Sequence, residues 1–369
     1  MLSPITYHLS SKRAGIFDPY LDTIGGGERY CLTLAEWLVT KGWQVEVFWP
    51  DGSIKERLCE KLNLDLERVK FVPNEIFTKN NLFRKWAKGR KYDLLFVVSD
   101  GSIPLMFGKK NILHFQVPFK NVDGKSFLNR LKLKKIDCVV CNSFFTKRII
   151  DQEFGVNTKV VYPPVPVEEL KPLRKGNIIL SVSRFSQLMQ AKRQDILING
   201  FKQMLKADRS GFLSGWKLIL AGGTEVGEKD FVKQLRRMVG GYPIEIITNP
   251  SFKNLQSLYG RAKIFWSAAG FGINEDKEPE KVEHFGITTV EAMASGCVPL
   301  VVGKGGQKEI VEDEVNGFFW ENENQLINLT LQLIEQKNLG KKMVLQSIKV
   351  SRKFSKERFC QEFEKILHE

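Results

Sequence analysis

The chain has no feature of a membrane-spanning or secreted protein. Its apolar runs all fall short of the roughly 20 residues that a helix needs to cross a bilayer. The opening residues, MLSPITYHLSSKRAGIF, lack the long apolar segment of a secretory signal. Hydrophobic residues make up 43% of the 369 residues and charged residues 27%, which is typical of a globular protein. We therefore expect a cytoplasmic protein.

Cysteine is scarce and scattered: the six thiols are Cys31, Cys59, Cys138, Cys141, Cys297 and Cys360. Only CVVC at 138–141 has the spacing of a motif. It lies in a β-branched run that predicts a strand, where side chains three positions apart point to opposite faces and do not converge on a metal. No second pair completes a zinc site, and scattered thiols suit a reducing compartment. We expect no metal site.

Histidine is scarcer still, with four in the chain: His8, His114, His284 and His368. The first and last lie near the ends of the chain. His114 closes the predicted strand NILHF, and the carboxyl end of a parallel strand is where ligands bind. A histidine at the edge of the core is the alternative explanation for it.

Acidic residues are outnumbered, so the net charge is +14. Residues 1–165 contain 26 basic and 17 acidic residues, and the excess is concentrated in 79–91 and 120–137. The first of these segments has six basic and no acidic residues, interleaved with leucine, phenylalanine and tryptophan. A solvated helix face is one explanation. Attraction to an anionic membrane is the other, and the apolar side chains favour it over nucleic acid.

Short β-branched and aromatic runs alternate with helical patterns along almost the whole chain. Strands are predicted at 13–17, 44–49, 69–72, 93–98, 111–115, 137–141 and 159–162, then at 177–185, 216–223, 244–249, 263–269 and 297–303. The first helix is predicted at 27–42, with Gly42 as its stop. This α/β rhythm predicts two parallel sheets covered by helices, with a cleft between them.

The chain is too long for one ordinary core, so two domains are expected. The segment VYPPVPVEELKP, residues 161–172, contains four prolines and breaks both periodicities, which marks it as the linker. We place the domains at 1–165 and 166–350, followed by a C-terminal helix at 351–369.

Glycine gathers at one place where phosphate chemistry is plausible. Gly25, Gly26 and Gly27 precede the first helix, and glycines let a backbone approach a ligand where free N–H groups favour anions. The loop matches neither a Walker A motif nor G-x-G-x-x-G. A plain flexible loop is the alternative.

Two cations follow the first strand of the second half, in SVSRFSQLMQAKRQD. Arg184 comes directly after the strand and Lys192 opens the next helix. A guanidinium fork and a point charge at one sheet edge suit a diphosphate. Solvent-facing charges are the alternative.

The stretch EHFGITTVE, residues 283–291, carries a glutamate at each end. Thr288 and Glu291 have the spacing of a capping box, which would explain Glu291 alone. Gly286 leaves backbone N–H groups at the helix start facing an anion. A carboxylate beside an anion site does not bind phosphate, but it can accept hydrogen bonds from sugar hydroxyls. Glu283 and Glu291 therefore fit a nucleotide sugar, which has a sugar on each side of a diphosphate.

Together these motifs resemble the GT-B, retaining family 4 (group 1) glycosyltransferases. The resemblance rests on EHFGITTVEAMASGCVPLVV with GGQKEIV, on SVSRF with AKRQD, and on GGGER, and it extends to NSFFTKRI and FSKERFCQEF. It therefore covers nearly the whole chain. It implies two Rossmann-like domains facing a central cleft, with the acceptor at 1–165 and the nucleotide sugar at 166–350. The helix at 351–369 would pack back on the first domain.

The resemblance also implies roles for the donor-site residues. Glu291 would bind the ribose, and Glu283 would hold the transferred sugar. The amides of Gly286 and Ile287 would reach the diphosphate or the sugar. Arg184 and Lys192 would neutralise the leaving diphosphate, so that neither a metal nor a cofactor is needed.

The first domain would contribute two further features. His114 matches a family histidine that contacts the donor sugar, although LHFQVPF departs from the commoner H-x-H arrangement. Gly25, Gly26 and Gly27 would lie near the diphosphate and the acceptor. Residues 1–11 precede the family's first strand and have no counterpart.

Three functions fit this sequence. The first is a retaining hexosyltransferase that uses a UDP- or GDP-sugar and a lipid-linked or polysaccharide acceptor, peripheral on the inner face of a membrane. The second is a GT-B enzyme with a small acceptor such as a sugar phosphate, which would not bind anionic vesicles. The third is a non-catalytic GT-B-like binding subunit; loss of Glu283, Arg184 or Lys192 would indicate it, and all three are present.

Overall fold

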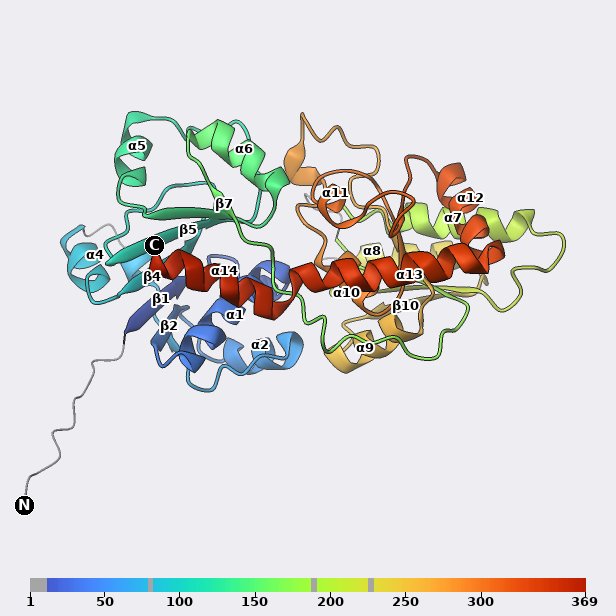
Figure 1. Ribbon diagram of the computed structural model, residues 1–369, viewed down its shortest axis with the longest axis horizontal. Helices are drawn as coiled ribbons and strands as arrows, with labels where there is room; N and C mark the ends of the chain where they lie inside the picture. Colours follow the sequence, from blue (N-terminus) through green and yellow to red (C-terminus); the bar gives the residue numbers. More distant parts are fainter. Residues whose placement is uncertain (1–11, 79–81, 187–190, 225–228) are drawn as a thin grey trace, which may run out of the picture. The chain divides into compact units, whose positions relative to one another are not determined.

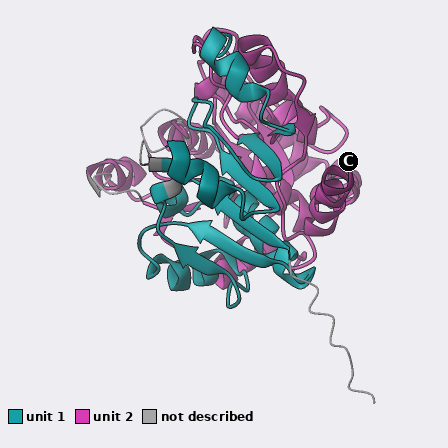
Figure 2. Ribbon diagram, turned by 90° about the vertical axis from the view of Figure 1, so that its left-hand side faces the viewer, with its two compact units in different colours: residues 1–114, 124–139 teal, residues 115–123, 140–369 magenta. Residues whose placement is uncertain are grey.

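The computed structural model describes residues 12–78, 82–186, 191–224 and 229–369 (Figure 1). The chain forms two compact units (Figure 2). Unit 1 contains the residues up to His114 together with 124–139, and unit 2 contains 115–123 and 140–369. The unexplained segment 1–11 lies outside the described residues, as does part of the basic segment 79–91.

A seven-stranded sheet has the strand order β3-β2-β1-β4-β5-β6-β7. Its strands are β1 (Arg13–Phe17), β2 (Gln44–Phe48), β3 (Lys70–Val72), β4 (Leu94–Val98), β5 (Lys110–Phe115), β6 (Cys138–Cys141) and β7 (Lys159–Val160). β1 pairs in parallel with both β2 and β4. Every residue of β4 is buried, because a parallel sheet is covered on both faces.

A six-stranded sheet has the order β10-β9-β8-β11-β12-β13, and all five neighbouring pairs are parallel. Its strands are β8 (Ile178–Val182), β9 (Lys217–Gly222), β10 (Ile244–Thr248), β11 (Ile264–Ser267), β12 (Val298–Val301) and β13 (Phe318–Phe319). Each of the twelve predicted strands is confirmed by a strand within or closely matching its run. The two-residue strand β13 was not predicted, because it is too short to show a period.

Helices connect the strands. They are α1 (Gly26–Thr40), α2 (Ile54–Leu62), α3 (Glu75–Thr78), α4 (Leu82–Gly89), α5 (Phe127–Leu133), α6 (Phe144–Phe154), α7 (Gln194–Ala207), α8 (Lys229–Val239), α9 (Phe252–Arg261), α10 (Ile287–Ala294), α11 (Gln307–Ile310), α12 (Glu323–Glu335), α13 (Lys337–Ser351) and α14 (Lys356–His368). Short 3₁₀ turns lie at Leu21–Thr23, Pro279–Lys281 and Arg352–Phe354. Among the described residues, no helix is both long and apolar enough to cross a bilayer.

Local chemistry sets the helix ends. The hydroxyl of Ser143 accepts the Thr146 N–H at the start of α6, and Gly155, with φ of 66°, ends that helix in the left-handed region. Gly42 follows α1 with φ of 82°, as the predicted stop requires. Serine at a helix start and glycine after a helix end are signals that can be recognised in the sequence.

Side chains along the six-stranded sheet alternate between two apolar clusters. Ile179, Leu218 and Leu220 belong to one cluster, with Phe201 of α7. The other contains Leu180 and Ile219, together with residues of α9 and α10. Two covered faces place this sheet in the middle of an α/β/α sandwich, so its ligand-accessible border is the carboxyl edge.

The domain boundaries and the packing of 351–369 stay predictions. No regular element covers the proline-rich segment 161–172, although Val165 forms an isolated bridge with Ser355. Lys159 of β7 forms an ion pair with Glu369, directly after α14.

Candidate functional site

The strand order of the six-stranded sheet reverses between β8 and β11. β9 and β10 continue from β8 in one direction, and β12 and β13 continue from β11 in the other. Loops leave such neighbouring strands in opposite directions and open a crevice at their carboxyl ends. Arg184 follows β8, and the loop that follows β11 runs to Gly286 at the start of α10. Residues of both predicted motifs therefore meet at this edge.

An ion pair joins the two motifs. Lys192 Nζ lies 2.8 Å from Glu283 Oε2, and the two side chains are only 11% and 20% exposed. Burial raises the pKa of Glu283, but the charge and the hydrogen bond of Lys192, with a smaller contribution from the charge of Arg184, outweigh it, so the pKa is lowered. Glu283 is a carboxylate at neutral pH. Arg184 is exposed, and its charge contributes to that lowering.

His284, next to Glu283, anchors the loop. Its Nε2 lies 3.1 Å from the carbonyl oxygen of Glu280. Burial lowers its pKa to about 4 against the opposing charge of Glu283, so the imidazole is neutral at pH 7. Sequence reasoning had assigned this histidine no role.

Two glycines hold the backbone of Glu283. The Gly306 N–H donates to the Glu283 carbonyl oxygen at 2.8 Å. A Cβ on Gly305 would lie 2.2 Å from that same oxygen, and a Cβ on Gly306 would lie 2.3 Å from the His284 oxygen. Only glycine fits this approach. The motif GGQKEIV was part of the resemblance, but no sequence pattern explains why its first two residues are glycines.

Gly286 has φ of 116° and is the N-cap of α10, which begins at Ile287. This left-handed conformation favours glycine, and it leaves the first N–H groups of α10 at the sheet edge. The capping box, which was the alternative explanation for Thr288 and Glu291, does not form: the N-cap is Gly286, two residues before Thr288, and no side chain caps the helix. Thr288 is therefore inside the first turn.

Glu291 is bound to a tyrosine instead. It is 8% exposed, and its Oε2 accepts a hydrogen bond of 2.8 Å from the hydroxyl of Tyr259 on α9. Burial, and next the negative charge of Glu291, raises the pKa of Tyr259 well above its ordinary value. The tyrosine is thus a permanent donor. A contact across 32 positions leaves no periodic signal in the sequence.

The glycine loop of unit 1 is also placed at a helix start. Gly25 is the N-cap of α1, which begins at Gly26, and its N–H donates to the carboxylate of Glu28. A side chain of the protein therefore already occupies that N–H. Asp18, at the end of β1, is fully buried, and burial and the charge of Glu28 raise its pKa to about 7. Sequence reasoning missed this acidic pair.

His114 lies on β5 and is fully buried. Its ring stacks on Tyr30 at 4.0 Å between centroids and on Phe96 at 5.7 Å. This is the setting of a core histidine, which was the alternative explanation. Contact between His114 and a donor sugar stays a prediction.

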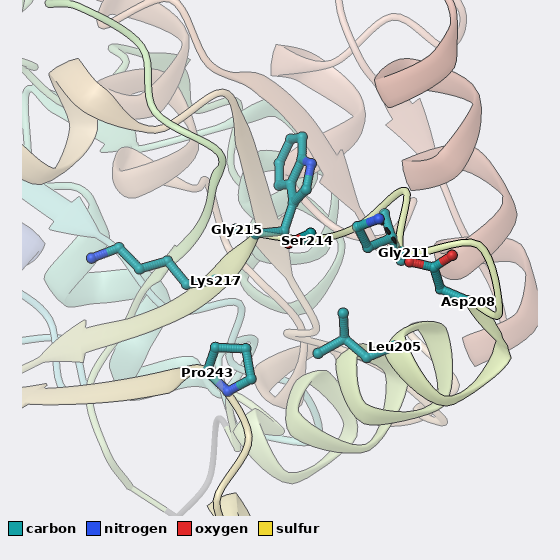
Figure 3. A pocket seen from close by; sticks show the side chains of 9 residues that line it. Leu205, Asp208, Gly211, Ser214, Gly215, Lys217 and Pro243 are labelled. Atoms are coloured by element: carbon teal, nitrogen blue, oxygen red, sulfur yellow. Dashed lines mark hydrogen bonds between the residues drawn. The ribbon is translucent and has the colours of Figure 1, made fainter.

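A cavity of about 460 Å³ lies at the opposite edge of the six-stranded sheet (Figure 3). Leu205, Gly215, Lys217 and Pro243 line it, at the end of α7 and at the starts of β9 and β10. Parallel sheets bind ligands at the other edge, and the residues of the ion pair lie there. We therefore assign the candidate site to the carboxyl edge.

Comparison with known families covers most of the chain. The family described as "Glycosyl transferases group 1" matches residues 167–350, and "Glycosyltransferase Family 4" matches residues 24–169. The two matches meet inside the proline-rich segment 161–172. Residues 24–350 therefore have family counterparts.

Two curated relatives illustrate the sequence similarity. The mouse "GDP-Man:Man(3)GlcNAc(2)-PP-Dol alpha-1,2-mannosyltransferase" is 30% identical over 51% of this chain and 39% of its own length. The Kluyveromyces lactis "Alpha-1,3/1,6-mannosyltransferase ALG2" is 27% identical over 79% of this chain and 69% of its own length. The chain thus spans about two fifths of the length of the first relative.

Among solved structures, Anabaena Alr3699/HepE in complex with UDP is similar over 97% of this chain and 99% of its own. The TM-score is 0.73 and the sequence identity 18%. This likeness shows a shared fold, two parallel-sheet α/β domains of the GT-B kind.

Proposed function

The chain belongs to the group 1, family 4 glycosyltransferases, and on this premise we propose that it is a retaining hexosyltransferase. It would move a hexose from a nucleotide-diphosphate sugar to a hydroxyl of a lipid-linked or glycan acceptor. The observation that carries the proposal is the Lys192–Glu283 ion pair at the switch point of the six-stranded sheet. It brings a phosphate-binding cation and a sugar-binding acid within hydrogen-bonding distance.

The cations serve the leaving group. Negative charge grows on the β-phosphate as the bond to the sugar breaks. Arg184 and Lys192 stabilise that charge, and so do the first N–H groups of α10 around Gly286 and Ile287. Groups already in place need no reorganisation during the reaction. This set does the work that a metal performs in other transferases, so we propose a metal-independent reaction.

The acids serve the two sugars. Glu283 is ionised and lies beside Lys192. There it can accept hydrogen bonds from hydroxyl groups of the hexose and stabilise positive charge at the anomeric carbon. Glu291 is assigned to the ribose by the resemblance. The acceptor hydroxyl attacks from the leaving-group face, and the departing phosphate takes its proton, as the family's usual mechanism has it. His114 and the loop Gly25–Gly27 keep their proposed roles at the donor sugar and the acceptor.

The comparisons suggest which donor to test first. The mouse relative's name specifies GDP-Man and a PP-Dol-linked glycan, and the Anabaena structure holds UDP. A GDP- or UDP-linked hexose is therefore the proposed donor, with GDP-mannose first. A glycan on a lipid diphosphate is the proposed acceptor class, ahead of a soluble sugar phosphate.

Exposed apolar side chains on two helices of unit 1 support the lipid-linked acceptor. Helices α4 and α5 expose large apolar side chains: Leu82 (58%), Phe83 (72%), Trp86 (43%), Phe127 (75%), Leu128 (67%) and Leu131 (45%). Both helices also carry basic residues and no acidic ones. Exposed apolar groups among cations match an anionic bilayer surface, and binding to anionic vesicles tests it.

The enzymatic proposal is tested with purified protein in EDTA. GDP-, UDP-, ADP- and TDP-sugars are compared by thermal shift and by slow donor hydrolysis. One nucleotide family should raise the melting temperature. Glu283→Gln should then lower turnover at least about 100-fold, the cost of losing one group that stabilises developing charge, while the nucleoside diphosphate still binds.

Glu312→Gln is the matched control, because Glu312 is an exposed acid of the same unit. It should behave as the wild type. Absence of a shift with all four donor families would refute the transferase. A shift without turnover or transfer under any acceptor would support the non-catalytic binding subunit.

A further inference from the structure

The hydrogen bond between Tyr259 and Glu291 has a geometry that suggests a role in donor recognition. We propose that Tyr259 is a positioning residue, which holds the Glu291 carboxylate in the orientation that binds the ribose hydroxyls of the nucleotide. This inference rests on the proposed function, because it takes Glu291 as the ribose ligand. It adds a residue to which no motif points.

The pair links two helices that pack into the same apolar cluster. Tyr259 lies in the last turn of α9 and is 1% exposed, whereas Glu291 lies in α10 and is 8% exposed. The hydroxyl donates to Oε2 at 2.8 Å. The contact is thus buried, and its length is normal for an O–H···O hydrogen bond.

The surroundings of the pair are apolar. Val290 and Ala292, the neighbours of Glu291 on α10, belong to the same buried cluster as Tyr259 and Phe265. A carboxylate in such surroundings needs a partner for its charge. A phenol supplies a hydrogen bond without neutralising the charge, and its raised pKa keeps the proton in place. The phenol therefore remains a hydrogen-bond donor to Glu291.

Tyr259 is itself fixed from behind. The Cys297 Sγ–H is 3.2 Å from the Tyr259 carbonyl oxygen and 3.3 Å from that of Ala262. The Tyr259 ring packs on Phe265 at 6.3 Å between centroids. Cys297 precedes β12, so the backbone of Tyr259 is held by a residue next to the sheet as well as by its own helix.

This hydrogen bond restricts the orientation of the Glu291 carboxylate. Because the tyrosine donates to Oε2, the phenol sets the direction in which the carboxylate faces a nucleotide. A carboxylate held this way can accept a hydrogen bond from a ribose hydroxyl with little loss of rotamer freedom. Without the phenol the side chain turns about its last two bonds, and the ribose loses its aligned acceptor.

The test is discrimination between sugars of the nucleotide, measured by calorimetry. GDP and UDP are each compared with their 2′,3′-dideoxy forms. We expect the wild type to bind the ribose form of its nucleotide at least about tenfold more tightly, which is 1.4 kcal/mol. In Tyr259→Phe that ratio should fall at least about threefold, while binding of the dideoxy form stays within about twofold.

Tyr92→Phe is the matched control. Tyr92 is also buried and donates to a glutamate, Glu46, but in unit 1. Its variant should lose stability without losing discrimination. If Tyr259→Phe does not fold, 4-aminophenylalanine at position 259 keeps a neutral donor of similar length and should retain most of the discrimination.

The outcomes separate the two ideas. In one outcome, the wild type and Tyr259→Phe prefer the ribose form over the dideoxy form by the same ratio. That result leaves the proposed function intact and overturns the positioning role. Loss of melting temperature with an unchanged ratio does the same, because it shows a purely structural tyrosine. A wild type that binds no nucleoside diphosphate overturns both.

Discussion

At the scale of single residues, the least expected feature is an acid buried in the first unit. Asp18 is fully buried, and the charged or ionisable groups that act on it are Glu28, Asp22 and Cys31. Its pKa is about 7 against an ordinary 3.8. Between these values the folded chain keeps a proton that the unfolded chain has released, so stability is largest below about pH 4 and falls as the pH rises through this window.

Asp18→Asn should remove that slope, because an amide is neutral at every pH and can still accept the Tyr20 N–H. The wild type should lose about 2 kcal/mol between pH 5 and pH 8 from this group, and the variant should lose far less. Urea unfolding at the two pH values measures it. Asp22→Asn, an exposed neighbour, should keep most of the slope. Equal slopes in wild type and Asp18→Asn would show that Asp18 is ionised in the folded protein.

Residue-level prediction from sequence was good where a residue type has one main use. Arg184, Lys192 and Glu283 were each assigned to one sheet edge, and the structure places them there. It was poor where the role of a residue depends on a contact with a partner far away in the sequence. Tyr259 and Glu291 lie 32 positions apart, and no local pattern connects them. Prediction was also poor where burial sets the pKa of a residue, because no sequence pattern near Asp18 indicates that its carboxyl is buried.

At the scale of elements, the loop after β11 depends on two glycines of another loop. A Cβ on Gly306 would lie 2.3 Å from the His284 oxygen and 2.5 Å from the Phe285 Cα, which are backbone atoms that cannot turn away. Gly306→Ala should therefore displace Glu283, lowering stability by about 1–3 kcal/mol and turnover more than about tenfold.

Thermal melting and donor hydrolysis measure both effects. Gly340→Ala is the control, because Gly340 lies in α13 with its nearest neighbour 3.9 Å from the added Cβ. It should be neutral or slightly stabilising. A Gly306→Ala variant with full activity would mean that the Glu283 loop is held by other contacts.

Element prediction succeeded for strands and left two alternatives open at one helix start. Parallel strands buried on both faces read as continuous apolar runs, so each of the twelve was recognisable. At the start of α10, Thr288 followed by Glu291 imitates a cap, although the N-cap is Gly286. The left-handed conformation of Gly286 lets the helix begin earlier, and a conformation of this kind is invisible in the pattern of polar residues.

At the scale of the whole molecule, the basic excess of the first half has a definite place. Part of it lies on α4 and α5, beside the exposed Phe83 and Phe127. The protein should sediment with vesicles that contain anionic lipid, since each cation near such a surface contributes about 1 kcal/mol. Binding should weaken as salt is added and should be absent on neutral vesicles.

Replacing Phe83, Trp86 and Phe127 together by serine should weaken vesicle binding at least about tenfold, because these side chains supply the apolar part. Leu345→Ser, which removes a similarly exposed leucine of α13, should have no effect. Sedimentation that is the same for the triple variant and the wild type would refute the surface. Failure of the wild type to bind would favour the small-acceptor enzyme.

The Lys192–Glu283 ion pair has a consequence for the energetics of donor entry. The lysine already has a counter-ion of its own, supplied by the protein and not by the buffer. A diphosphate that reaches Lys192 therefore replaces one negative partner with another, and few dissolved salt ions leave the site. The Michaelis constant for the donor should then depend weakly on ionic strength, while attachment to the bilayer depends on it steeply. The same chain would thus respond to salt in two ways: weakly at Lys192, which is already paired with Glu283, and strongly at the basic helices α4 and α5.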